Sequence, residues 1–229
     1  MDGQTLMLSA KRISLFLGHY GSGKTNVAVN WSIYLEKSGY KTAIYDLDVV
    51  NPYFRTLDGK GMLTDAGVRL VASTFANSNV EVPAIPADNY AIIDKKDEHA
   101  VVDVGGDDRG AFALGRYSQA IVKENDYNAY LVINKYRFLT REPEEVAEYL
   151  KEIEFAAGIK MTALVNNSNL GGETTEKTVT DSVEYAKRCS SLTGLPIAFT
   201  AVRRDIADSL VGKIEDVFPM EMIKYGEWE

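Results

Sequence analysis

Eight consecutive residues at positions 18–25 constrain the fold of this chain more than any other feature. Their sequence, GHYGSGKT, has glycines at positions 18, 21 and 23 and ends in Lys-Thr, which fits the pattern G-x-x-x-x-G-K-[ST]. Because glycine has no side chain to block a close approach, the backbone N–H groups of such a loop can curl around a chain of phosphates. Such a loop needs a buried strand before it and a helix after it.

The flanking residues meet that requirement. The apolar run 13–17 predicts a strand, and Val27, Trp31, Tyr34 and Leu35 fall on one face of a helix predicted over residues 25–37. Lys24 would reach the β- and γ-phosphates of a nucleotide, and Thr25 would offer its hydroxyl to Mg²⁺. The rest of the predicted nucleotide-binding cradle comprises Gly18, Gly21, Ser22, Gly23 and Asn26.

Apolar runs of strand length alternate with helical segments along the chain. Strands are predicted at 13–17, 42–45, 69–72, 100–104, 129–133, 162–165 and 197–199, and helices at 25–37, 109–123, 143–157, 176–193 and 206–212. This alternation indicates an α/β fold with three layers, in which a mostly parallel twisted sheet carries helices on both faces. We expect one nucleotide-binding domain over residues 1–229, with an irregular insertion near 73–97.

Composition excludes several function classes. The 229 residues carry a formal charge of −8, whereas non-specific binding to DNA needs a basic surface. The single cysteine, Cys189, excludes an internal disulfide and a four-cysteine metal site within one chain. There is no apolar run of about 20 residues and no signal-peptide pattern at the N-terminus. We therefore expect a cytoplasmic protein without a nucleic-acid or membrane partner.

Aspartates follow two of the predicted strands. In open α/β sheets, ligands bind beyond the carboxyl ends of strands, so these carboxylates are expected beside the phosphates. Asp46 and Asp103 are predicted on the metal side, together with Thr25, and Asp48 is predicted to orient the water that attacks the γ-phosphate. Gly106 is placed like a glycine whose N–H senses that phosphate. The alternative is that these aspartates are turn or helix-capping carboxylates.

The sequence gives weaker signals for which nucleotide base is bound. A guanine-binding motif Asn-Lys-x-Asp begins at Asn134 but has Arg137 in place of the acid. Asn166 and Asn167 follow a later strand, and an asparagine amide can bond the amino group and a ring nitrogen of adenine. Adenine is therefore favoured, with Asn166 predicted to bind the nucleotide. Both asparagines could equally be turn formers.

At these residues the chain resembles a branch of the P-loop NTPases. That branch contains the chromosome-partitioning and division-site-selection ATPases, the nitrogenase iron protein and dethiobiotin synthetase, and it includes CobQ/CobB-like domains. The resemblance rests on the loop 18–25, on Asp46-x-Asp48, on Asp103-x-x-Gly106 and on Val165-Asn166. It implies ATP, Mg²⁺, a parallel sheet and often a homodimer that closes face to face around nucleotide.

One residue departs from the pattern of this branch. Its partitioning ATPases carry a lysine at the second loop position that reaches the partner's phosphates, and this chain has His19 there. The resemblance therefore leaves the homodimer open and predicts slow hydrolysis. It also rules out an iron–sulfur cluster like that of the iron protein, because Cys189 is alone.

Three functions remain open. The leading hypothesis is an ATP-binding, Mg²⁺-dependent ATPase that acts as a slow switch, in which the γ-phosphate orders residues 46–55 and 105–110 and a protein partner reads the change. The second is an ATP-dependent small-molecule kinase or ligase of the dethiobiotin synthetase type. The third is a nucleotide-binding partner module with negligible turnover.

Overall fold

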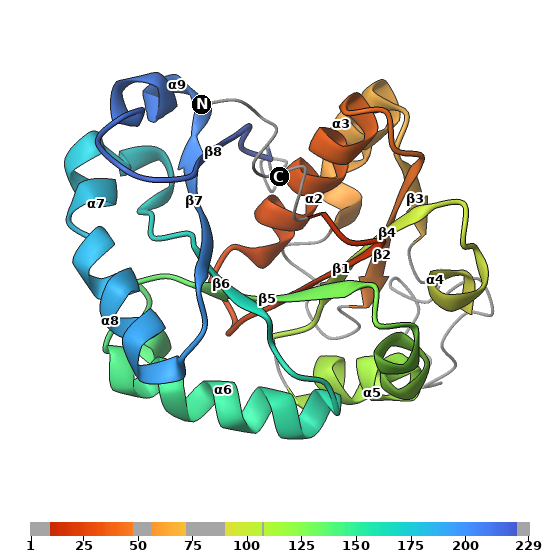
Figure 1. Ribbon diagram of the computed structural model, residues 1–229. Coiled ribbons are helices and arrows are strands. Elements are labelled where there is room, and N and C mark those ends of the chain that lie inside the picture. The colour runs from red at the N-terminus through yellow and green to blue at the C-terminus, as the bar shows by residue number, and fades with distance from the viewer. Residues whose placement is uncertain (1–9, 48–55, 72–89, 107, 224–229) are drawn as a thin grey trace, which may run out of the picture.

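Parallel strands form the centre of the structure. The computed structural model describes residues 10–47, 56–71, 90–106 and 108–223. Within these residues eight strands form one sheet in the order β3-β2-β4-β1-β5-β6-β7-β8, and every neighbouring pair is parallel. The strands are β1 (Ile13–Leu17), β2 (Thr42–Leu47), β3 (Arg69–Val71), β4 (His99–Val104), β5 (Tyr127–Ile133), β6 (Ala163–Asn166), β7 (Ile197–Arg203) and β8 (Val217–Met220) (Figure 1).

Helices connect the strands, as parallel pairing requires. The α-helices are α2 (Lys24–Lys37), α3 (Lys60–Ala66), α4 (Ala91–Asp94), α5 (Asp108–Glu124), α6 (Pro143–Ala157), α7 (Glu176–Thr180), α8 (Val183–Thr193) and α9 (Arg204–Ala207). Short 3₁₀ turns are η1 (Thr56–Gly59), η4 (Phe138–Thr140), η5 (Gly171–Glu173) and η6 (Asp208–Leu210). Left-handed Gly158 and Gly194 end α6 and α8.

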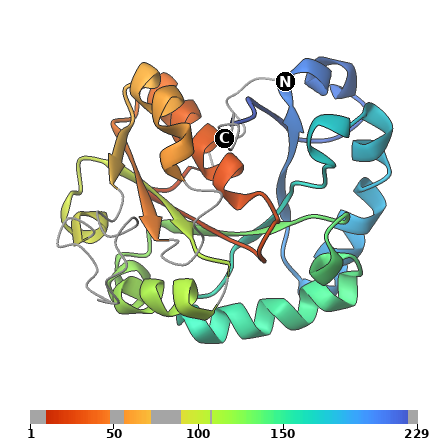
Figure 2. The same cartoon turned by 180° about the vertical axis from the view of Figure 1, so that it is seen from behind.

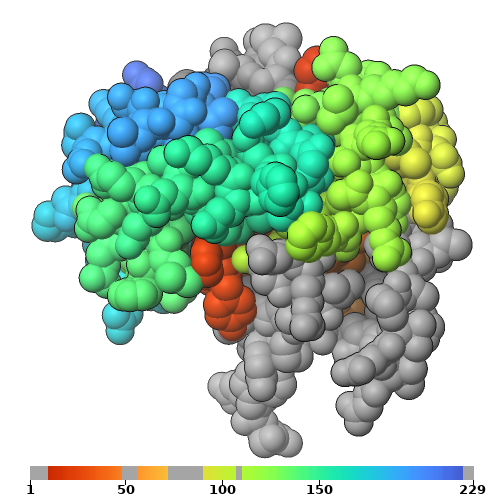
Figure 3. All heavy atoms as spheres, turned by 90° about the horizontal axis from the view of Figure 1, so that it is seen from below, coloured from red at the N-terminus to blue at the C-terminus, as the bar shows by residue number. Residues whose placement is uncertain are grey.

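The helices form two layers, one on each face of the sheet. Helices α2 and α3 cover one face and α5, α6 and α8 cover the other, as views from the front and from behind show (Figures 1 and 2). Seen from below, α5, α6 and α8 lie side by side across their layer (Figure 3). Neighbouring residues of β1 alternate between the layers, since Leu15 packs into the α5–α6–α8 core and Phe16 into the α2 core. The predicted α/β fold class is confirmed.

Aromatic rings fill the α2 side of the core. Trp31 is fully buried and lies parallel to Phe199, with ring centroids 5.4 Å apart and planes 9° apart. Its indole N–H donates to the Ser14 hydroxyl over 3.0 Å. This bond satisfies the polar end of a large side chain, so the central strand and the first long helix are fixed against each other.

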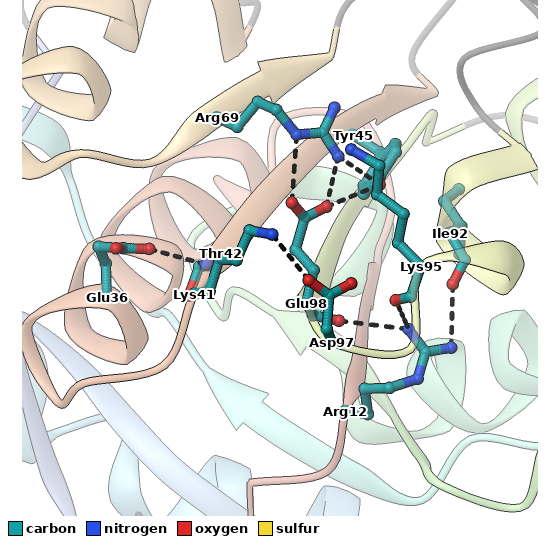
Figure 4. Close-up of polar contacts among 10 residues, drawn as sticks. All are labelled: Arg12, Glu36, Lys41, Thr42, Tyr45, Arg69, Ile92, Lys95, Asp97 and Glu98. Carbon is teal, nitrogen blue, oxygen red and sulfur yellow. Dashed lines mark hydrogen bonds and ion pairs between the residues drawn. The ribbon is translucent and has the colours of Figure 1, made fainter.

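Two partly buried ion pairs lie at the amino-terminal ends of the strands. Arg69 donates to the Glu98 carboxylate and to the Tyr45 hydroxyl, the latter over 2.9 Å (Figure 4). Burial alone raises the pKa of Glu98, but the Arg69 guanidinium outweighs this and holds it below its ordinary value. Arg12 pairs with Glu124 and donates to backbone carbonyls of the segment before β4. These ion pairs therefore stabilise the fold at the amino-terminal ends of the strands, and the functional site is sought at the carboxyl ends.

Several boundaries differ from the predictions. The predicted helix 176–193 is divided into α7 and α8, because Ser182 bonds back to the Val179 carbonyl between them. The helix predicted at 206–212 is the shorter α9 followed by η6. Strand β8 and helix α3 were not predicted, and α4 lies within the span predicted as an irregular insertion. Asp48 and residues 72–89 lie outside the described residues.

Candidate functional site

The glycine loop connects β1 to α2 in the predicted order. Gly21 and Gly23 have φ angles of 77° and 83°, a left-handed conformation that residues with side chains adopt only at a cost. The Ser22 N–H donates to the His19 carbonyl over 3.0 Å, which closes a tight turn within the loop. Lys24 and Thr25 begin α2 and are both buried. The loop is therefore a compact turn at the positive end of a helix dipole.

Neighbouring segments pack closely against this loop, and at three glycine positions a β-carbon would lie too near another atom. A β-carbon at position 18 would lie 2.6 Å from the Val132 carbonyl oxygen, and one at position 23 would lie 2.3 Å from the Asn167 amide nitrogen. A β-carbon at position 106 would lie 2.8 Å from the Tyr20 nitrogen. Strand β5 and the loops after β4 and β6 therefore converge on the glycine loop at the carboxyl ends of the strands.

A pocket of about 440 Å³ opens beside the glycine loop. Its walls come from the loop and the start of α2, from the segments that follow β5 and β6, and from the carboxyl ends of β7 and β8. The lining residues are Tyr20, Gly21, Gly23, Lys24, Thr25, Asn26, Arg137, Asn167, Asn169, Gly171, Thr174, Arg203, Met220 and Met222. This volume lies within the range of small-molecule sites, and its position matches the ligand crevice of open α/β sheets.

The predicted metal-side carboxylates lie next to each other. Asp46 and Asp103 are register partners in β2 and β4, both are buried, and the Thr56 hydroxyl donates to Asp103 over 3.1 Å. Two residues earlier in these strands, Ile44 and Val101 pack in the α2 core. Because side chains alternate along a strand, both carboxylates are on the face that α2 covers.

This donor set suits a magnesium ion. The carboxylates of Asp46 and Asp103 and the hydroxyl of Thr25 are hard oxygen donors, which Mg²⁺ prefers. Among the residues that the structure describes, no group of three or more histidine, cysteine, aspartate or glutamate side chains gathers around one point.

The structure separates the two asparagines that follow β6. Asn166 ends the strand, and its side chain bonds to the Ser182 and Ser168 hydroxyls away from the pocket lining. Asn167 lines the pocket and donates to the Ser22 carbonyl over 2.7 Å. Its Oδ1 is buried without a hydrogen-bond partner in the described part of the chain. Of the two asparagines considered for base binding, Asn167 therefore lies at the pocket and Asn166 does not.

The other predicted cradle residues occupy distinct positions. Lys24 and Asn26 line the pocket, and the Asn26 side chain also accepts a 3.0 Å bond from the Ile223 N–H, which anchors the segment after β8. The Ser22 hydroxyl is buried beneath the loop near Gly18, and the Ser22 side chain is not among the pocket walls. His19 is half-buried, with its ring centroid 5.1 Å from that of Tyr149.

Sequence reasoning missed several pocket residues. Asn169, Gly171 and Thr174 form a turn-rich stretch after β6, where Gly171 has a φ of 62°. Arg137, also missed, lies at the start of η4. Arg203, which the sequence offered either as a phosphate or partner contact or as a surface charge, ends β7 and lines the pocket. The cluster of asparagine and glycine at 166–172 was a usable signal for a loop at the site, whereas nothing in the sequence placed Arg137 beside the glycine loop.

Comparison with known proteins agrees with this geometry. A family model described as the CobQ/CobB/MinD/ParA nucleotide binding domain matches residues 17–175, which is more than half of the chain. A search of curated proteins finds no match. In the described residues, we find no helix with the length and apolar character needed to cross a bilayer.

Solved structures share the fold at low identity. FtsY from Thermotoga maritima is 16% identical with a TM-score of 0.54, over 83% of this chain and 61% of that one. FtsY from Mycoplasma mycoides is 17% identical with a TM-score of 0.53, over 83% and 59%. Signal recognition particle 54 kDa protein from Aeropyrum pernix, in complex with GDP, is 18% identical with a TM-score of 0.50, over 82% and 40%. The chain thus corresponds to less than two thirds of these proteins' lengths.

Proposed function

Because the chain belongs to the CobQ/CobB/MinD/ParA nucleotide-binding domain family, we propose that it binds a nucleoside triphosphate, preferably ATP, and hydrolyses it slowly as a nucleotide-dependent switch. The observation that carries this proposal is the glycine loop itself, which has left-handed Gly21 and Gly23, leads into the start of α2 and lines a pocket of about 440 Å³. Backbone N–H groups in such a turn, at the N-terminus of a helix, form a concavity that binds anions such as phosphate. We propose further that the whole chain acts as one domain and works in the cytoplasm, where ATP is abundant.

The proposed roles follow from position. Lys24 and Thr25 line the pocket at the start of α2, so the lysine ammonium would neutralise the β- and γ-phosphates and the helix dipole would add to it. Thr25, Asp46 and Asp103 would hold Mg²⁺ directly or through its waters. When bound, that ion would neutralise charge on the phosphate oxygens. Asp48 keeps its proposed role of orienting the attacking water.

The contact between Gly106 and the glycine loop supports the switch. The loop after β4 lies against the backbone of Tyr20 and Gly18 without room for a side chain at position 106. A γ-phosphate placed in the cradle would therefore meet this loop, and its loss after hydrolysis would change the contacts of that loop. A protein partner would read that change.

Asn167 supports a preference for a base with an exocyclic amino group. Its amide nitrogen donates one of its two N–H groups to the Ser22 carbonyl, and its buried carbonyl oxygen, which has no partner in the described residues, can only accept. The N6 amino group of adenine is a donor of the required kind. The GDP of the archaeal structural neighbour makes guanine the necessary comparison, because guanine also has an amino group.

Calorimetric titration with ATP and GTP, with and without Mg²⁺, tests the proposal. We expect Lys24→Ala to weaken ATP binding by at least about 100-fold, because a charged hydrogen bond to phosphate is lost. Lys37→Ala, at the exposed far end of the same helix, is the matched control and should bind ATP like the unaltered chain. Equal affinity of the Lys24→Ala variant and the unaltered chain would contradict the proposal.

Phosphate release then separates the switch from its alternatives. Slow release of phosphate from ATP without any acceptor is the expected result. The rate per chain is measured at several protein concentrations, and a rate that rises with concentration indicates a homodimer. Release only in the presence of a small metabolite would favour a kinase or ligase instead.

A further inference from the structure

Arg137 occupies a fixed position beside the glycine loop. Its backbone N–H donates to the Asn134 carbonyl over 3.1 Å, and its carbonyl accepts from the Thr140 N–H over 3.1 Å. The neighbouring Tyr136 hydroxyl donates to the Thr178 carbonyl over 2.8 Å. These bonds hold the turn between β5 and α6 against the segment that follows β6, so the backbone of Arg137 is held in place.

The Arg137 side chain lies over Gly21. A β-carbon at position 21 would be 3.6 Å from the Arg137 Nε and 3.9 Å from its Cζ. The same side chain lines the pocket together with Lys24 and Thr25. The guanidinium therefore lies within van der Waals distance of the glycine loop at position 21.

In the described residues this guanidinium has no hydrogen-bond or ion-pair partner, in contrast to that of Arg203, which also lines the pocket. Arg203 forms a bidentate pair with Asp205 and donates to the Gly172 carbonyl over 2.7 Å. Arg137 forms no hydrogen bond or ion pair of its side chain within the described chain, and it is exposed. An exposed arginine is often no more than a solvated surface charge. Arg137 differs because its charge lies at a loop proposed to hold phosphates.

We propose that Arg137 binds the γ-phosphate of the nucleotide in the same chain and stabilises the charge that develops when the phosphate is transferred to water. This inference rests on the proposed function. In that step, the water oxygen bonds to the γ-phosphorus, and the bond from that phosphorus to the bridging oxygen breaks. The diphosphate leaves with the bonding electrons, and the proton of the water passes to the released phosphate.

An arginine suits this role better than a lysine. Its planar fork donates two parallel N–H bonds to phosphate oxygens, and it stays charged at any physiological pH. The loop position at which related ATPases present a lysine to a partner is His19 here, and its ring packs near Tyr149. The Arg137 guanidinium would neutralise phosphate charge from within the same chain, so no partner subunit would be needed for this.

The test compares Arg137→Ala with Arg137→Lys and with Arg141→Ala, a matched control. Arg141 is also exposed, four residues further on, and outside the pocket walls. We expect Arg137→Ala to weaken ATP binding about 10- to 100-fold in the presence of Mg²⁺ and ADP binding by much less. Single-turnover phosphate release should slow as well. The ATP affinity and phosphate release of Arg137→Lys should lie between those of Arg137→Ala and the unaltered chain. Arg141→Ala should match the unaltered chain.

Two results would overturn the role of Arg137. One is unchanged ATP affinity and phosphate release in Arg137→Ala; the other is an equal loss of ATP and ADP affinity, which would place the arginine away from the γ-phosphate. Lys24→Ala, measured in parallel, distinguishes failure of the Arg137 inference from failure of the proposed function. If Lys24→Ala loses ATP and Arg137→Ala does not, the Arg137 inference alone fails, and if neither loses ATP, the proposed function fails.

Discussion

Replacement of Gly23 by alanine tests how the glycine loop is held. The residue has a φ of 83°, and a β-carbon there would lie 2.3 Å from the Asn167 amide nitrogen. Asn167 is buried and donates to the Ser22 carbonyl over 2.7 Å, so it would have to turn away and break that bond. The backbone term should cost about 1 kcal/mol, since left-handed strain is partly offset by a less flexible unfolded chain.

The displaced amide adds a second term. Leaving a buried carbonyl and amide unpaired costs about 1–3 kcal/mol, so Gly23→Ala should lower the free energy of unfolding by about 2–4 kcal/mol. Gly39→Ala is the matched control, because Gly39 has a φ of 93° and nothing within 4 Å of a β-carbon. It should show only the backbone term of about 1 kcal/mol.

Urea unfolding of the four chains of a double-mutant cycle measures the coupling. With Asn167→Ala in the background, Gly23→Ala should cost about as much as Gly39→Ala, because the collision is removed. The reasoning is refuted if Gly23→Ala and Gly39→Ala destabilise the protein equally, or if the cost of Gly23→Ala does not change when Asn167 is absent.

Four further predictions concern the scaffold. Arg12→Ala should lower the free energy of unfolding by about 3 kcal/mol, because Glu124 is left partly buried without its main partner. The Arg12 bond lowers the pKa of Glu124, so its stabilisation is complete above the unfolded pKa of about 4.3 and is lost as pH falls through the lower folded pKa. Acid titration of stability should therefore be flatter for Glu124→Gln, and an identical slope would contradict this. Trp31→Ala should cost about 3–5 kcal/mol in chemical denaturation, and a loss below about 1 kcal/mol would argue against the aromatic core. Burial raises the pKa of Cys189 to about 12, so Ellman's reagent should label the native protein only as fast as it unfolds, and rapid labelling would show an open thiol.

The segment from β1 to α2 was predictable because its signals are local. An apolar run of strand length, a glycine spacing that fits one loop geometry, and a helical face with Trp31 stand next to each other in the sequence. The structure places β1 at Ile13–Leu17 as predicted and begins α2 one residue early, at Lys24.

Strand β8 and helix α3 were missed for a physical reason. Pro219 lies within β8, and proline cannot donate to a sheet ladder, so such a run does not look like a strand. The strand forms because it is at the edge of the sheet, where one side of its backbone needs no partner. Helix α3 has seven residues, of which only Leu63 is buried, so its periodic signal is weak.

Asn166 and Asn167 are adjacent in the sequence, but only Asn167 lines the pocket. The predicted strand ended at 165, whereas β6 extends to Asn166. Leu164, two residues earlier, packs in the α5–α6–α8 core, so Asn166 faces that layer and bonds to Ser182. A shift of one residue along a strand reverses the side-chain direction, and a sequence does not define strand ends that closely.

Arg137 could not be placed from the sequence at all. Its relation to Gly21 depends on β5 lying next to β1 in the sheet, which strand order fixes and local pattern does not. The sequence indicated only that a guanine-binding acid was missing at this position. The same residue becomes a candidate for phosphate binding once the sheet is assembled.

A crystal structure of the protein with Mg²⁺ and a non-hydrolysable ATP analogue tests the central claim most directly. The account predicts that the triphosphate lies along residues 18–25, with its γ-phosphate near Lys24 and its base toward Asn167. A nucleotide bound elsewhere, or none bound under saturating conditions, would contradict it.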